Sequence, residues 1–326
     1  MTTIDAGHRS RKVAALSPDV QQRLQCPKTK ARLIECEGLL QSSTDPCVRY
    51  PIIDGVPILI CDEKSLFSVD DFVGRKSTTF DLSGRKRGVA MLMKLLPSIS
   101  ANVKARTNYA RLAQSLPRGA RILVIGGSIM GQGMEPIYED GSFEVVGSDV
   151  SFGPYTGLIC DAHDVPFADE TFDCVIVQAV LEHVLDPVRC VAEIWRVLKP
   201  TGVVYSETPF MQQVHMRQYD FTRFTHLGHR RLFRRFEEVG SGPACGPGMA
   251  LAWAYTFFLR SFATSPLLRR LLTLFGYLTS FPLKYFDYFL IDRPGAYDAA
   301  SGFYFWGRKS STSVDDRELI KQFRGV

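Results

Sequence analysis

The sequence predicts an α/β chain built on a doubly wound, mostly parallel β-sheet, with a small β-rich N-terminal unit and a helical insertion near the C-terminus. Short apolar runs alternate with helical patterns from Arg121 onward, as in sheets whose parallel strands are joined by helices. A glycine-rich turn follows the first of these runs. Apolar residues make up 45% of the 326 residues and charged residues 22%, which excludes an intrinsically disordered chain.

Three zones precede the predicted sheet. Residues 1–20 are polar and are expected to form a disordered tail, and without an apolar stretch they are not expected to be a signal peptide. Residues 21–62 form a compact β-rich unit with several turn signals. Residues 63–118 are charged and then helical, and apolar residues at helical spacing predict helices over 87–96 and 103–116.

Residues 119–244 are expected to hold the parallel core. Strands buried on both faces appear as short apolar runs. The runs predicted as strands are 122–125, 143–147, 156–160, 172–177 and 203–205. An amphipathic helix is predicted over 187–198. Its apolar face consists of Val188, Val191, Ile194, Trp195 and Leu198.

Residues 245–300 form an aromatic, helical insertion with breaks at proline residues. The uncharged stretch 271–283 is shorter than the roughly 20 residues that span a bilayer, so no transmembrane helix is predicted. Residues 301–310 are predicted to return to the sheet as its last strand, and residues 311–326 form a polar tail.

Charge and cysteine content restrict the partners and the compartment. Lysine and arginine number 39 against 34 acidic residues, and a net charge of +5 predicts no nucleic-acid partner. The 8 cysteines are spread along the chain and fit reduced thiols in the cytoplasm better than a secreted disulfide scaffold.

Residues at the ends of the first three core strands point to a ligand. Small residues after the first strand let a ligand approach the backbone, and the helix that follows offers free N–H groups. Asp149 ends the second strand, where a carboxylate can accept both hydroxyls of a ribose. Asp161 follows the third strand and can accept from an adenine amino group while Ala162 donates its backbone N–H. The alternatives are a tight turn without a ligand and a helix N-cap at Asp149.

Further short motifs follow in order. They are Asp161–Phe167, Phe172–Val175, Leu181–Val184 and Leu198–Gly202. With the glycine turn, they make the stretch of about residues 105–240 similar to the class I S-adenosylmethionine-dependent methyltransferases, in the branch of small methyltransferase domains. The resemblance implies a Rossmann-like methyltransferase fold. The chain departs from the family at Val124, where an acidic residue is usual, and at Ser128, which replaces the second glycine of the turn.

The resemblance also implies a pocket for S-adenosylmethionine. Asp149 would bind the ribose, Asp161 and Ala162 the adenine, and Gln178, at the tip of the fourth strand, would face the methyl group. The residues around the methionine moiety would be Gly126, Gly127, Ser128 and Gly131.

The segment after the fifth strand resembles one in related methyltransferases and offers catalytic candidates. His215 could act as a general base oriented by Asp220, with Arg223 holding an anionic group of the substrate. The alternative is that Asp220 and Arg223 form a structural pair and Thr225 caps the next helix. We expect His183, which opens a helix beside the cofactor, to be structural.

The N-terminal unit resembles a small zinc-ribbon-like domain found as an activator of RNA and protein methyltransferases. The resemblance rests on Cys26–Leu33 and Tyr50–Ile60. Thr29 occupies the place of the second cysteine of a metal-binding pair, so no zinc and no other metal ligand is predicted. We interpret the unit as a degenerate ribbon that packs against the enzyme or gates its substrate.

Together these patterns predict a methyltransferase that transfers a methyl group to an O or N acceptor on a small molecule or a glycan- or lipid-linked intermediate. A non-catalytic cofactor-binding or partner-regulating module is the alternative, and a dehydrogenase a poorer third. The insertion is expected to shape the acceptor pocket, as a cap over it, or to form a dimer surface. A basic cluster near it is by default a solvated helix face, and with the aromatic helices it offers peripheral membrane contact as the alternative. The cluster comprises Arg217, Arg223, Arg230, Arg231, Arg234 and Arg235. The sequence does not indicate an oligomeric state.

Overall fold

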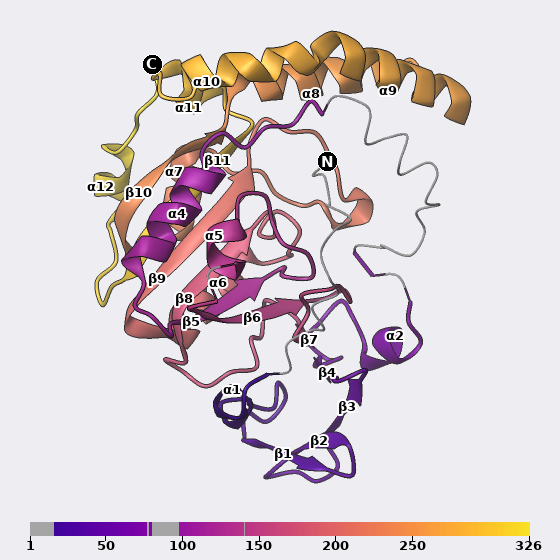
Figure 1. The fold of residues 1–326 in the computed structure, drawn as a ribbon, viewed down its shortest axis with the longest axis vertical. Coiled ribbons are helices and arrows are strands. Elements are labelled where there is room, and N and C mark those ends of the chain that lie inside the picture. Colours follow the sequence, from indigo (N-terminus) through magenta and orange to yellow (C-terminus); the bar gives the residue numbers. More distant parts are fainter. Residues whose placement is uncertain (1–15, 77, 80–97, 140) are drawn as a thin grey trace.

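The computed structural model describes residues 16–76, 78–79, 98–139 and 141–326, and its centre is a parallel β-sheet (Figure 1). The five parallel strands are β5 (Arg121–Ile125), β6 (Glu144–Asp149), β7 (Leu158–Cys160), β8 (Phe172–Gln178) and β9 (Leu198–Pro209). They lie in the order β7-β6-β5-β8-β9, which confirms the predicted doubly wound, mostly parallel sheet. From β5 in the middle, the chain first adds β6 and β7 on one side and then crosses back to add β8 and β9 on the other side. The switch of direction beside β5 is where such sheets bind ligands.

Two further strands complete the sheet at the β9 side. β11 (Gly302–Lys309) lies between β9 and β10 (Phe236–Cys245) and runs antiparallel to both, which confirms the predicted last strand. The sequence did not predict β10, because its glycines and Pro243 resemble a broken loop. An edge strand tolerates them, since only one side needs hydrogen bonds, and its register shifts twice against β11.

The N-terminal hairpins are joined to the core sheet. Their strands are β1 (Leu33–Cys36), β2 (Leu39–Ser42), β3 (Arg49–Ile53) and β4 (Val56–Leu59). They pair antiparallel in chain order, and β4 then pairs parallel with β7 through Ile58 and Ile159. One sheet of 11 strands therefore includes the unit that the sequence presented as separate.

Both termini are more ordered in the described residues than the sequence predicted. The expected disordered tail 1–20 includes Leu16 and Val20, which are buried, and helix α1 (Pro18–Gln22) begins there, capped by Ser17. The expected polar tail 311–326 contains helix α12 (Asp316–Ile320), whose Leu319 is buried. These corrections have one cause: isolated apolar side chains in polar segments bury against elements distant in sequence.

Helices cover both faces of the sheet and extend its core. On one face, Tyr109 and Leu112 of α4 (Ala105–Ser115) join a core that includes strand residues of β5 and β8. On the other, α6 (Pro187–Val197) buries Cys190, Val191 and Ile194. Val188, expected on the buried face of this helix, is 68% exposed in its first turn, and the buried residues of the helix begin at Cys190. The helix predicted over 87–96 lies outside the described residues.

Smaller helices connect the strands and surround the site. They are α2 (Val69–Val73), α5 (Glu135–Tyr138), the 3₁₀ turn η1 (Arg217–Tyr219) and α7 (His226–Leu232). The helical insertion forms the top of the molecule in Figure 1 and consists of α8 (Pro247–Arg260), α9 (Pro266–Ser280), η2 (Phe281–Phe286), α10 (Asp287–Leu290) and α11 (Gly295–Ala299). Among the described residues, we find no helix with the length and apolar character needed to cross a membrane.

Two buried histidines of α7 make the fold sensitive to acid. Nε2 of His226 lies 2.9 Å from Ser241 Oγ, and Nε2 of His229 lies 2.9 Å from Ser206 Oγ. Burial lowers the pKa of His226 to about 4 and that of His229 to about 3. The unfolded chain, with a histidine pKa near 6.5, therefore takes up protons before the folded chain does.

We predict that the free energy of unfolding is largest above pH 6.5 and falls as the pH approaches 4. The loss should be on the order of 2 kcal/mol for each ring at pH 5. Urea denaturation at pH 7.5 and pH 5 measures it, and His229→Gln should reduce the difference between the two. An equal urea midpoint at both pH values would contradict this account.

Candidate active site

The glycine turn lies at the switch point and is held by Asp149. Gly126 has a φ of +75°, and a Cβ there would lie 2.3 Å from Val180 Cγ2, so the turn packs against the segment that follows β8. The backbone N–H of Ser128 donates to Asp149 Oδ2 at 2.9 Å. Burial raises the pKa of Asp149, although hydrogen bonds from Ser128 and neighbouring N–H groups oppose the shift. The structure thus brings the predicted ribose ligand and the predicted methionine turn together.

Asp161 is buried at the end of β7 beside Ala162, as the sequence placed them. Ser65 Oγ donates to Asp161 Oδ2 at 2.5 Å, and the backbone N–H of His163 donates to Oδ1 at 2.9 Å. Burial alone would raise the pKa of Asp161, but the hydrogen bonds from His163 and Ser65 outweigh it and hold the pKa below its usual value. Ser65, which sequence analysis did not select, brings the N-terminal part of the chain to this edge of the sheet.

Gln178 belongs to a polar network that the sequence did not reveal. Its Nε2 donates to Glu207 Oε2 at 2.8 Å, and Asn102 Nδ2 donates to the same oxygen at 2.7 Å. The hydroxyl of Tyr205 donates to Glu207 Oε1 at 2.7 Å. A Cβ at Gly131 would lie 1.9 Å from Gln178 Oε1, so the absence of a side chain in the turn makes room for Gln178.

A second group of side chains lies just beyond β8. Nε2 of His183 is 3.2 Å from Nε2 of His215, and the two atoms lie 3.6 and 3.8 Å from Glu182 Oε1. Glu182 is fully buried, and neither of its carboxylate oxygens has a hydrogen-bond partner among the residues that the structure describes. Burial raises the pKa of Glu182 to about 8, while burial and the neighbouring His215 lower that of His183 to about 4. Sequence analysis selected only His215 and undervalued its two neighbours.

The segment between β9 and α7 folds back over this group. The backbone N–H groups of Phe221 and Thr222 donate to the carbonyl of Glu182 at 2.8 and 3.2 Å, which fixes the approach of His215. The backbone N–H of His215 donates to Asp220 Oδ2 at 2.8 Å. His215 and Asp220 are therefore neighbours, as predicted.

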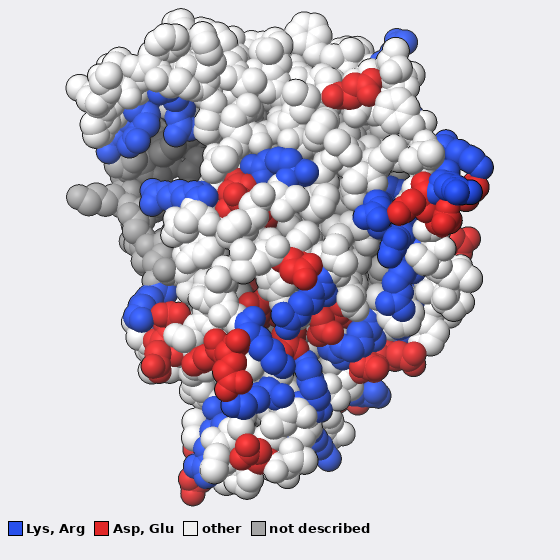
Figure 2. All heavy atoms as spheres, turned by 180° about the vertical axis from the view of Figure 1, so that it is seen from behind, with Lys and Arg blue, Asp and Glu red and all other residues white. Residues whose placement is uncertain are grey.

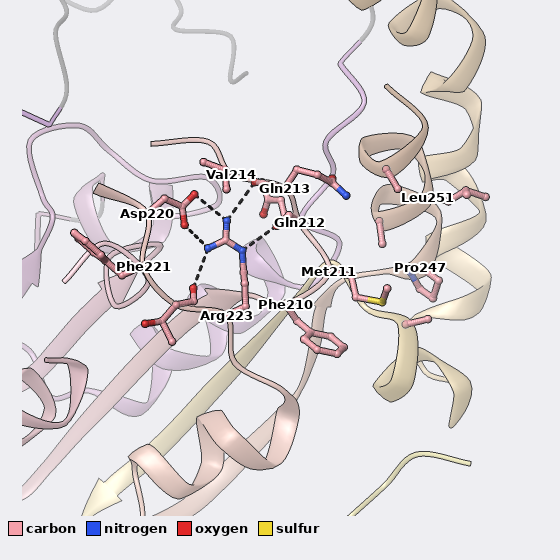
Figure 3. Close-up of a pocket in the computed structure, with 14 residues that line it drawn as sticks. Phe210, Met211, Gln212, Gln213, Val214, Asp220, Phe221, Arg223, Pro247 and Leu251 are labelled. Atoms are coloured by element: carbon pink, nitrogen blue, oxygen red, sulfur yellow. Dashed lines mark hydrogen bonds and ion pairs between the residues drawn. The ribbon is translucent and has the colours of Figure 1, made fainter. Parts of the chain in front are cut away.

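Arg223 is held by its own segment (Figure 3). It forms an ion pair with both oxygens of Asp220 and donates from Nε to the carbonyl of Gln212 at 2.8 Å. Burial raises the pKa of Asp220, but Arg223 and the N–H of His215 outweigh this and hold it far below its usual value. The structural Asp220–Arg223 pair considered as an alternative is thus present, and Thr225 caps α7 by accepting from Gly228 N–H.

A pocket of about 720 Å³ opens beside this segment, between it and α8 (Figure 3). Most of its lining is apolar, with Asp220 and Arg223 as its charged residues. The apolar residues are Phe210, Met211, Val214, Phe221, Pro247, Ala250, Leu251, Ala254 and Ala299. The helical insertion therefore does contribute a pocket wall at the carboxyl end of β9.

The cysteines of the N-terminal unit do not gather. The Cys26 thiol lies 3.3 Å from the Tyr50 hydroxyl, Cys36 and Cys47 are exposed, and Cys61 is buried. Within the described ranges, the one group of side chains with metal-ligand spacing is Glu182, His183 and His215. The zinc-free N-terminal unit stays a prediction.

Part of the core sheet is similar to a known family. Residues 127–206 match the model of a family described as a methyltransferase domain. This stretch runs from the glycine turn to the middle of β9, so it includes the candidate site residues from Gly127 to Gln178 and is similar to a methyltransferase domain.

Among curated relatives, the ubiquinone/menaquinone biosynthesis C-methyltransferase UbiE of Saccharophagus degradans is 30% identical over 152 residues, which are 46% of this chain and 55% of the relative. UbiE of Desulfotalea psychrophila is 40% identical over 68 residues, 20% of this chain and 26% of the relative. The chain thus spans about half or less of the length of these two relatives.

Two solved structures align with about two thirds of this chain at low sequence identity. Phosphoethanolamine N-methyltransferase 2 of Haemonchus contortus, in complex with S-adenosyl-L-methionine, aligns with a TM-score of 0.43 and 17% identity, over 65% of this chain and 54% of that one. A putative sarcosine dimethylglycine methyltransferase of Galdieria sulphuraria aligns with a TM-score of 0.41 and 15% identity, over 63% of this chain and 84% of that one.

Proposed function

We propose that this chain transfers a methyl group to an oxygen or nitrogen atom of a small molecule or a glycan- or lipid-linked intermediate. The observation that carries the proposal is the proximity of two chemistries at one edge of the sheet. The glycine turn held by Asp149 contacts Val180, and the group of Glu182, His183 and His215 begins two residues later. A cofactor site and a proton-accepting site are therefore continuous.

The residues on the cofactor side fit S-adenosylmethionine. The carboxylate of Asp149 suits ribose hydroxyls, Asp161 with Ala162 suits the adenine, and the turn leaves its backbone accessible. Gln178, fixed by Glu207, would orient the donor's reactive end. The bound cofactor supplies an electrophilic methyl group on a positively charged sulfur. Gly126, Gly127, Ser128 and Gly131 remain the proposed methionine contacts.

His215 is the proposed group that takes the acceptor's proton. Its side chain is 24% exposed, so a substrate can reach it, and burial lowers its pKa, which keeps the ring neutral at pH 7. Asp220 positions His215 through the backbone N–H. Because Arg223 is occupied by Asp220 and by backbone carbonyls, we assign it a positioning role in place of a direct contact with a substrate anion.

The apolar pocket favours an acceptor with a hydrophobic portion. Such a group would lie in the pocket between α8 and the segment that carries His215. Asp220 lines this pocket and also accepts the backbone N–H of His215, so the pocket lies beside the proposed base.

Incubation of the purified chain with ¹³C-methyl-labelled S-adenosylmethionine and a lipid extract tests the acceptor atom. A product whose new methyl carbon resonates as an O-methyl or N-methyl group supports the proposal. A C-methyl product, the chemistry named for the UbiE relatives, would contradict it.

The surface of the helical insertion suits an anionic lipid membrane. Figure 2 shows the top of the molecule mostly free of charged side chains, which crowd the lower part of this face. Large exposed apolar side chains on these helices include Phe258, Phe262, Leu267, Leu271, Phe275, Leu278, Phe286 and Phe289. Between residues 246 and 290 the sole acidic residue, Asp287, is buried, whereas Arg269 and Arg270 are exposed. Apolar burial and anionic headgroups would both favour docking.

Part of the basic cluster noted in the sequence is not free for lipid. Arg230 is buried and pairs with Glu238, and Arg231 pairs with Asp316. The membrane proposal therefore relies on the arginines of α9.

We predict that the chain co-sediments with phosphatidylglycerol-containing vesicles at low salt and less with neutral vesicles. Charge reversal of both Arg269 and Arg270 to glutamate should reduce the bound fraction several-fold, since each basic residue near an anionic surface contributes about 1 kcal/mol. The same reversal at Arg118, in the turn between α4 and β5, is the control. Absence of binding to anionic vesicles at low salt would refute the membrane contact.

A further inference from the structure

We propose that Glu182, His183 and His215 form a binding site for a divalent transition-metal ion. This inference goes beyond the proposed methyl transfer and deepens it, because it rests on the same group of side chains. The sequence predicted no metal ligand, and it separates His183 from His215 by 32 positions. The fold brings one carboxylate and two imidazole nitrogens together at the carboxyl end of β8.

The spacing of the three donor atoms suits one shared cation. His183 Nε2, His215 Nε2 and Glu182 Oε1 are separated by 3.2, 3.6 and 3.8 Å. Ligands that each lie about 2.0–2.2 Å from one metal ion are roughly 3–3.5 Å apart in tetrahedral or octahedral geometry. Small side-chain adjustments would place all three within bonding distance.

The surroundings turn the lone pairs of both rings toward this point. His183 Nδ1 lies 2.7 Å from the carbonyl of Tyr219, a contact that requires Nδ1 to carry the proton and leaves Nε2 as a lone pair. His215 Nδ1 faces two acceptors, the carbonyl of Gln213 at 3.3 Å and Asp220 Oδ2 at 3.5 Å. These contacts favour the same tautomer, although Arg223 Nη2 also lies 3.5 Å from His215 Nδ1. Such outer contacts are typical of histidines that bind metals.

Glu182 provides the independent observation. Its side chain is fully buried, both oxygens lack a hydrogen-bond partner within the described part of the chain, and Oε1 faces the two Nε2 atoms. An unpaired carboxylate is costly to bury, and two lone pairs opposite it add no compensation. A cation at the centre would satisfy all three groups. The nearest further charges, Asp220 and Arg223, pair with each other, so they do not offset the charge that Glu182 acquires when it ionises.

The ligand set indicates the kind of ion and its role. Two imidazoles and one carboxylate suit zinc, iron(II), manganese or cobalt better than magnesium or calcium, which prefer oxygen ligands. Three protein ligands leave an open position, as in catalytic metal sites. An acceptor hydroxyl bound there would release its proton to solvent more readily. His215 would then act as a ligand of the ion and would not take the proton itself.

Cobalt(II) binding to the metal-stripped full-length chain tests the site without cofactor or acceptor. We expect one cobalt ion per chain, with visible absorption bands of nitrogen and oxygen ligation and no thiolate-to-cobalt charge-transfer band. Glu182→Gln and His215→Ala should each weaken binding at least about 10-fold, whereas Glu63→Gln, at an exposed ion pair with Lys28, should leave it unchanged. Circular dichroism checks that each variant is folded, and His183→Gln is a further variant should one of them unfold.

Equal affinity of wild type and both variants, or a thiolate band, would overturn the metal site. Methyl transfer is measured separately, so the two proposals can fail independently. Transfer without cobalt binding refutes the metal site and leaves His215 as the base. Cobalt binding at the cluster without transfer to any acceptor refutes the proposed function and leaves the metal site.

Discussion

Replacing Asp149 with alanine is expected to weaken S-adenosylmethionine binding by about 100-fold or more. The carboxylate would accept two hydrogen bonds from the ribose, and hydrogen bonds to a charged group contribute roughly 1.5–3 kcal/mol each. Asp149 also accepts from the Ser128 N–H, so the glycine turn loses its tie at the same time. Isothermal titration calorimetry of the purified variant measures the change.

Two variants separate these contributions. Asp149→Asn keeps an oxygen for the Ser128 N–H but removes the charge, and we expect it to bind the cofactor about 10-fold more weakly than the wild type. Asp169→Ala is the control. It removes an exposed carboxylate that pairs with Arg196, and this variant should bind S-adenosylmethionine with wild-type affinity. Cofactor affinity within 3-fold of wild type in Asp149→Ala would exclude Asp149 as the ribose ligand.

Replacing His215 with alanine is expected to lower turnover by about 10²–10⁴-fold while cofactor affinity changes little. General acid–base groups contribute in this range, and the metal proposal predicts a loss of turnover as well, because the ion would lose a ligand. His215 contacts Glu182, His183, Asp220 and Trp253 and is not among the proposed cofactor contacts. Steady-state methyl transfer with saturating cofactor, paired with calorimetry, separates kcat from cofactor binding.

Gln218→Ala is the matched control, since Gln218 is exposed in the same segment. It should keep wild-type turnover. His215→Gln retains a polar side chain but no basic nitrogen, and it should be as slow as His215→Ala if proton removal is the role. Wild-type turnover in either His215 variant would remove His215 from the mechanism.

The parallel core could be predicted because each of its strands carries its signal locally. The run 122–125 is apolar throughout and the run 172–177 is apolar except for Asp173, since both faces of the sheet are covered. Strand β10 carries no such signal, because an edge strand with glycines and a proline is stabilised by its pairing with β11 and not by its own sequence. The junction of β4 with β7 joins residues about 100 positions apart, and no local pattern encodes it.

Some residues of the candidate site could likewise be predicted from the sequence and others could not. Asp149 and the glycine turn were predictable, because Asp149 ends one strand and the turn directly follows another, and the carboxyl ends of these strands meet at the switch point. The group of Glu182, His183 and His215 was not, because it depends on how the segment after β9 folds back through the N–H groups of Phe221 and Thr222. For Arg223 the sequence left open a substrate contact and a structural pair with Asp220, and the structure contains the pair, three residues apart.

The central claim is that the chain catalyses methyl transfer from S-adenosylmethionine, and one assay tests it most directly. The purified chain is incubated with methyl-labelled cofactor and a cell extract that includes the lipid fraction, beside Asp149→Ala and His215→Ala. The account predicts label in a discrete product with the wild type and near-background label with both variants. Wild-type protein that binds the cofactor but labels no product above the level of His215→Ala would contradict it and favour a non-catalytic cofactor-binding module.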